Sequence, residues 1–222
     1  MKPRTTLMVG TFAVIVALAL WQGAEGPAAS AQVGMFHQAS NVSMALLAAD
    51  AEFVGSSKCK KCHLPEHKSW EGLRHGKAFE TLKPGNAAEA KTKFKLDPAK
   101  DYTKDATCVA CHTVGFGKPG GYQIPADEEA AKKMKPLEGV GCENCHGAGG
   151  SYITVHEEIM KSKRKYKEAE MIAAGSAKPD KAVCLTCHND KSPTFDASKP
   201  FDFEAKKKEG VHESTPLKQL EP

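Results

Sequence analysis

The pentapeptide Cys59-Lys60-Lys61-Cys62-His63 is the strongest indication of the fold, because its pattern occurs four times in the chain. The pattern consists of two cysteines three positions apart, followed at once by histidine. The other copies are Cys108-Val109-Ala110-Cys111-His112, Cys142-Glu143-Asn144-Cys145-His146 and Cys184-Leu185-Thr186-Cys187-His188. Together the four copies use all eight cysteines of the 222-residue chain. No cysteine is therefore left over for another role.

This pentapeptide is the pattern by which haem c is attached covalently. Two thiols at this spacing reach the two vinyl groups on one edge of the porphyrin, and the next residue places its imidazole under the iron. We therefore predict four covalently attached haems c. The thioether residues would be Cys59, Cys62, Cys108, Cys111, Cys142, Cys145, Cys184 and Cys187, and the proximal iron ligands would be His63, His112, His146 and His188.

Two other kinds of site use paired cysteines. Zinc ribbons bind their metal with C-x-x-C pairs, and exported proteins form disulfides. Neither kind of site needs a histidine after every second cysteine. Haem attachment explains the histidine and is the preferred interpretation.

The composition favours a domain that is built around its cofactors. Hydrophobic residues make up 41% of the chain but aromatic residues only 7%, so the protein's own core would be thin. We expect one mainly α, multihaem cytochrome c domain, with short helices and loops wrapped around four closely packed haems and little β structure. The expected helices cover residues 86–96, 127–134, 151–174 and 204–209, with Gly175 as a stop after the third. Residues 115–125, rich in Gly and Pro, are expected to form a loop.

The N-terminus reads as a signal peptide over residues 1–31. Lys2 and Arg4 precede an apolar run, and Ala29-Ser30-Ala31 forms a cleavage site of small residues. Residues 32–50 would then be an N-terminal extension, and residues 51–222 the tetrahaem domain. This organisation predicts a periplasmic or extracellular protein without a stable membrane span after cleavage.

The formal net charge of +4 does not include the cofactors. Haem propionates would make the holoprotein mildly negative, so the lysine excess is interpreted as propionate neutralisation. Binding to nucleic acid is not expected. The basic runs 161–167 and 206–208 are interpreted as solvated faces. The alternative is that they pair with haem propionates or dock an acidic redox partner.

Five histidines remain as candidates for the second axial position: His37, His67, His75, His156 and His212. With so many histidines, His/His ligation is favoured over His/Met. His67 lies four residues after His63, so on a helix both rings project from one face. It cannot reach the far side of its own haem and is expected to be an exposed surface histidine.

Several stretches resemble the tetrahaem cytochrome c-554 family. They are Ala49 to Phe53, Trp70, His75 to Pro84, Leu96-Asp97-Pro98-Ala99-Lys100-Asp101-Tyr102, the second motif with Gly115-Phe116-Gly117 and Gly120-Gly121-Tyr122, and Gly139-Val140-Gly141 before the third motif. The resemblance implies a mostly helical protein with haems in close pairs, which accepts electrons from hydroxylamine oxidoreductase.

The resemblance also implies an arrangement of ligands. His156 would be the distal ligand of the haem at His63, His75 that of the haem at His146, and His212 that of the haem at His188. The haem at His112 would be five-coordinate. The segment with His37 precedes the family-like part, so His37 is a candidate sixth ligand for that iron, within the chain or in a neighbouring subunit.

These observations predict electron transfer between exported redox proteins, and not an enzyme. One alternative is a subunit of an extracellular cytochrome filament, in which His37 ligates the haem of a neighbour. Another is reduction of a small molecule such as nitric oxide at an open second haem. The loop residues Thr113, Tyr122 and Gln123 near the second motif form no catalytic constellation, which favours the electron carrier.

Overall fold

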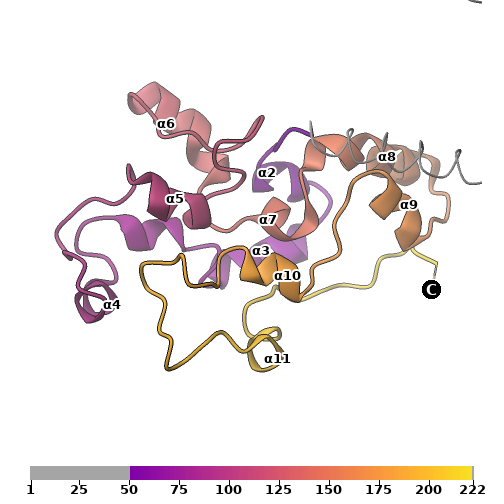
Figure 1. The fold of residues 1–222 in the computed structure, drawn as a ribbon. Helices are drawn as coiled ribbons and strands as arrows, with labels where there is room; N and C mark the ends of the chain where they lie inside the picture. The colour runs from indigo at the N-terminus through magenta and orange to yellow at the C-terminus, as the bar shows by residue number, and fades with distance from the viewer. Residues whose placement is uncertain (1–50, 222) are drawn as a thin grey trace, which may run out of the picture. The chain divides into compact units, whose positions relative to one another are not determined.

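The structure, a computed structural model, describes residues 51–221. Within this range there is no strand, and β pairing is confined to isolated bridges between Thr113 and Glu138 and between Tyr166 and Leu220. The predicted mainly α fold with little β structure is confirmed (Figure 1). The expected signal peptide, residues 1–31, and the extension, residues 32–50, lie outside the described residues.

The helices are short, and even the longest of those described, α8, has only 14 residues. Isolated helices of this length are marginal in water, so packing must stabilise them. Their bounds are α2 Ser56–Cys59, α3 Leu64–Gly72, η1 Phe79–Leu82, α4 Ala88–Lys93, α5 Ala106–His112, α6 Glu128–Met134, η2 Lys135–Leu137, α7 Cys142–His146, α8 Gly149–Ser162, α9 Glu168–Ala173, α10 Lys181–Leu185 and α11 Phe203–Lys206.

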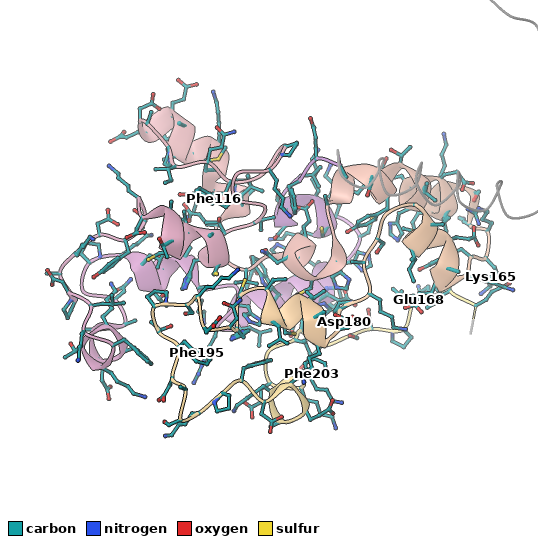
Figure 2. All side chains as sticks on the ribbon, in the orientation of Figure 1. Phe116, Lys165, Glu168, Asp180, Phe195 and Phe203 are labelled. Carbon is teal, nitrogen blue, oxygen red and sulfur yellow. The ribbon has the colours of Figure 1, made fainter. Side chains whose placement is uncertain are left out.

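Aspartate side chains begin four of these helices. Each accepts a hydrogen bond from a backbone N–H of the first turn, which satisfies a donor that the helix itself cannot pair. The caps are Asp105 at α5, Asp127 at α6, Asp180 at α10 and Asp202 at α11. Two of them precede haem motifs, and Asp180 is labelled at the start of α10 in Figure 2. The helix predicted for residues 127–134 is confirmed as α6.

The single helix predicted for residues 151–174 is wrong, because the chain breaks it into α8 and α9. Lys163 adopts a left-handed conformation with φ 58°, and Tyr166 is buried and pairs its backbone with the C-terminal segment. Figure 2 labels Lys165 and Glu168 at this bend. Gly175, with φ +104°, follows the end of α9 and is the stop that the sequence indicated.

Two other predicted helices are present with different bounds. Residues 86–96 contain only α4, Ala88–Lys93, and α11 covers Phe203–Lys206 where residues 204–209 were expected. Residues 115–125 form a loop, as predicted. Gly121 is required there because a Cβ atom at this position would lie 1.9 Å from the carbonyl oxygen of Gly115.

The described residues bury two small apolar clusters. The larger consists of Phe79, Leu82, Tyr102, Val109, Val114, Tyr122 and Leu137, and the smaller consists of Ile159, Tyr166 and Met171. Between them lie the helices that carry the first, third and fourth motifs (Figure 1). No helix in residues 51–221 is long and apolar enough to cross a membrane.

Candidate haem-binding sites

Each of the four motifs includes helical backbone. The second motif ends α5 at His112, and the third motif is the whole of α7. In the first motif Cys59 ends α2 and His63 caps α3. In the fourth motif Cys184 lies in α10, and the turn that follows carries His188.

Three motif histidines lie opposite a histidine from a distant part of the chain. The ring centres of His63 and His156 are 5.6 Å apart, with the planes inclined at 24°. Those of His146 and His212 are 6.2 Å apart at 34°. Those of His188 and His75 are 6.2 Å apart at 55°.

These separations fit an iron atom between the two imidazoles. A bond from a metal to an imidazole nitrogen is about 2 Å long, and the ring centre lies about 1 Å behind that nitrogen, so ring centres across one metal are about 6 Å apart. The donor set also fits, because paired imidazoles are common axial ligands of haem. The residues present therefore suit the haem that the motifs predict.

Hydrogen bonds on the opposite ring nitrogen favour the tautomer needed for ligation. The Nδ1–H group of His75 donates to the Gly210 carbonyl at 2.7 Å, and that of His212 donates to the Glu213 carbonyl at 2.8 Å. With the proton on Nδ1, Nε2 keeps the lone pair that binds a metal.

Burial keeps several of these rings neutral. It is the main cause that lowers the pKa of His112, His146, His156 and His188, because an imidazolium ion is poorly solvated inside the protein. The facing histidine lowers the pKa of each of the last three further. A neutral imidazole is the form that ligates iron.

His112 differs from the other motif histidines. Its Nδ1–H group donates to the Ala78 carbonyl at 2.7 Å, but no histidine within residues 51–221 faces its ring. The expected candidate for this position, His37, lies outside the described residues. The described part of the chain thus contains one proximal histidine without a facing partner.

The facing pairs agree with the ligand pairing that the resemblance implied for His156, and they differ from it for the other two histidines. His75 lies opposite His188 and not His146, and His212 lies opposite His146 and not His188. The physical reason lies in the C-terminal segment, which returns alongside α3. There Glu213 N–H donates to Ser69 Oγ at 2.9 Å, and this contact delivers the neighbouring His212 to the third motif.

His67 was expected to be exposed, and this expectation is wrong. Its side chain is only 7% exposed, and its ring lies edge-on to Trp70, with ring centres 5.2 Å apart. Within residues 51–221, Nδ1 has no hydrogen-bond partner and lies 3.4 Å from Glu71 Oε1. The ring faces no motif histidine in that range, so the structure does not favour His67 as an axial ligand.

Cysteines from different motifs also lie close together. Cys59 is a neighbour of Cys142, and Cys111 is a neighbour of Cys187. Helix α7 contacts both α2 and α10. The first motif therefore adjoins the third, the third adjoins the fourth, and the fourth adjoins the second.

Glu143, inside the third motif, has a structural role that the sequence did not indicate. Its carboxylate is 2% exposed and accepts hydrogen bonds from the backbone N–H groups of Val54, Gly55 and Gly149 at 2.9, 2.8 and 2.7 Å. Val54 and Gly55 lead directly into α2. Glu143 thus ties the segment before the first motif to the third motif.

Two of the three facing histidine pairs border one cavity of about 530 Å³. Its walls include His63, His156, His146 and His212. A space of this volume lies within the range of small-molecule and cofactor sites. The adjoining positions of the first and third motifs explain why one cavity serves both pairs.

Comparison with known proteins finds similar cytochromes. A sequence model of the family "Cytochrome c554 and c-prime" matches residues 58–147, which contain the first three motifs. Cytochrome c-554 of Nitrosomonas europaea is 44% identical over 161 residues. That alignment covers 70% of this chain and 66% of the relative, just under two thirds of its length.

A solved structure extends the similarity to the fold. The reduced state of cytochrome c554 from Nitrosomonas europaea matches with a TM-score of 0.67 and 39% sequence identity. The match covers 78% of this chain and 91% of that one.

Proposed function

Because this chain belongs to the cytochrome c554 family of multihaem electron-transfer proteins, we propose that it carries four covalent haems c and relays electrons between redox proteins. The observation that carries the proposal is the set of three facing imidazole pairs. In each pair a motif histidine meets a histidine from outside the motifs.

The proposed ligand sets are His63 with His156, His146 with His212, and His188 with His75. Each haem supplies a one-electron centre, and the chain supplies its attachment, axial ligands and surroundings. Paired neutral imidazoles favour a lower potential than a His/Met set. These three sites would therefore act as carriers and not as sites for an exogenous ligand.

The contacts between motifs support an order for the relay. Cys111 is a neighbour of Cys187, α10 contacts α7, and Cys142 is a neighbour of Cys59. The haems are proposed to follow one another in the order second, fourth, third and first motif. The first and second haems then lie at the two ends, where redox partners would exchange electrons.

The N-terminal segment supports the proposed compartment. The signal-peptide pattern of residues 1–31 indicates export, so the partners are proposed to be periplasmic or extracellular redox proteins. Residues 51–222 would form the tetrahaem domain, preceded by the extension of residues 32–50.

The ligand sets are tested by replacing each distal histidine in the holoprotein. Mass spectrometry of the unmodified protein should show about four added haems. His75→Ala, His156→Ala and His212→Ala should each convert one haem from low to high spin in the ferric EPR spectrum. His67→Ala is the matched control, because His67 faces no motif histidine, and it should convert none. Conversion by His67→Ala, or none by the other three, contradicts the assignment.

His37 is the proposed sixth ligand of the haem at His112, supplied by the chain or by a neighbouring subunit. It is the remaining histidine once His67 is set aside and the other pairs are assigned. The test is to delete residues 32–42 behind an intact signal peptide and to compare spin state and particle size. A full-length monomer with one high-spin haem, unchanged by the deletion, contradicts this role and leaves the electron-transfer proposal intact.

A further inference from the structure

Residues 210–215, here called the C-terminal strap, lie along α3 and its continuation to His75. The Gly210 carbonyl accepts from His75 Nδ1–H at 2.7 Å, and Glu213 N–H donates to Ser69 Oγ at 2.9 Å. Thr215 N–H donates to Glu66 Oε1 at 3.0 Å. Residues with higher numbers along α3 and its continuation pair with residues of lower numbers on the strap. The two segments therefore run in opposite directions.

The approach of Gly210 to His75 is unusually close. A Cβ atom at residue 210 would lie 3.2 Å from His75 Cε1 and 3.7 Å from His75 Nδ1. The backbone of Gly210 is not left-handed, so no turn requires glycine at this position. The absence of a side chain instead lets the carbonyl reach the ring without pressing on it.

A carbonyl acceptor on Nδ1 has two consequences for an imidazole that ligates iron. It fixes the tautomer and the orientation of the ring, and it increases the basicity of the ligating nitrogen. A more basic ligand stabilises the ferric state more than the ferrous state. The hydrogen bond therefore lowers the reduction potential of the iron that His75 ligates.

We propose that Gly210 is a positioning residue for the haem at His188. Its carbonyl holds the ring of His75 in the ligating tautomer and keeps the potential of that haem low. The inference rests on the proposed function, in which His75 is the distal ligand. His212 follows two residues later and faces His146. One short segment thus tunes the ligand of one haem and supplies the ligand of the next.

The experiment uses holoprotein with Gly210→Ala, which places a methyl group against the ring of His75. Gly72→Ala is the matched control. Gly72 lies three residues from His75, but a Cβ atom there meets nothing within 4 Å. Potentials are measured by a redox titration followed by EPR, and the haem that His75→Ala converts to high spin identifies the relevant signal.

Gly210→Ala should raise the midpoint potential of that haem. Loss of this outer hydrogen bond should weaken ligation of the ferric iron more than that of the ferrous iron. A tenfold difference between the two states corresponds to a shift of about 59 mV. Gly72→Ala should leave the potential unchanged. If both glycine variants keep the wild-type potential while His75→Ala converts one haem, Gly210 has no positioning role and the proposed function stands. If His75→Ala converts no haem, the proposed ligand set itself fails.

A measurement on the unmodified protein covers the case in which Gly210→Ala does not mature. The Nδ1 proton of His75, identified by its loss in His75→Ala, is followed by NMR after transfer to D₂O. A hydrogen bond to the Gly210 carbonyl should slow its exchange well below that of a free imidazole N–H. Exchange at the rate of a free imidazole would overturn the proposal.

Discussion

Replacing Glu143 by Gln tests how the first and third motifs are held together. Oε1 accepts from Gly149 N–H and Val54 N–H, and Oε2 accepts from Gly55 N–H and, at 3.2 Å, also from Val54 N–H. Gln keeps one oxygen, and its least costly orientation directs the NH₂ group at Gly55. One hydrogen bond to a charged group, worth about 1.5–3 kcal/mol, is then lost, and a buried N–H faces another donor.

The expected destabilisation is about 3 kcal/mol, from the lost bond and the orphaned N–H. With a urea m-value of about 2 kcal/mol per M, the unfolding midpoint should fall by about 1.5 M. The assay is urea unfolding of the holoprotein followed by far-ultraviolet circular dichroism, after mass spectrometry has shown that the variant carries the same number of haems as the unmodified protein.

Glu89→Gln is the control. Glu89 is exposed on α4 and makes no ion pair or side-chain hydrogen bond within the described residues, so its effect should stay within about 0.5 kcal/mol. A Glu143→Gln midpoint equal to that of the control would refute the reasoning. It would mean that the three N–H groups find acceptors elsewhere.

Two further predictions concern single aromatic residues. Burial raises the pKa of Tyr122 to about 12, so the contribution of this side chain to stability is complete below pH 10 and is lost as pH rises through 12. Tyr122→Phe keeps the packing on Phe79 and should resist alkaline unfolding better when circular dichroism is followed against pH. An unchanged alkaline midpoint would argue against this prediction. Phe201 stacks on the ring of His188, with ring centres 4.3 Å apart and planes inclined at 13°. Phe201→Leu should free the His188 ring and change the EPR signal of one haem only, the haem that His75→Ala converts to high spin. An unaltered spectrum would show that other contacts fix the His188 ring.

Much of the local structure follows from residue types that act over a few positions. The haem-attachment pattern, the helix at residues 127–134 with its cap Asp127, and the stop at Gly175 were all predictable. So was the dominance of helix over strand. Each of these features depends on side-chain chemistry or backbone preference within one or two turns.

The helix predicted for residues 151–174 failed for a reason that lies elsewhere in the chain. Its residues favour helix, but Tyr166 gains more from burial beside Ile159 and from backbone bonds to Gln219 and Glu221. That partner segment lies about fifty residues away in sequence. Periodicity within the helix carries no information about it.

The proposed iron ligands also depend partly on local sequence and partly on tertiary structure. The motifs alone identified the four proximal histidines as candidates, since spacing to the cysteines fixes them, and the family resemblance named His75, His156 and His212 as their partners. Their pairing depended on the course of the C-terminal strap, which lies antiparallel to α3. The approach of Gly210 to His75 was equally out of reach, because contacts between residues 135 positions apart are set by tertiary packing and not by the residues at either end.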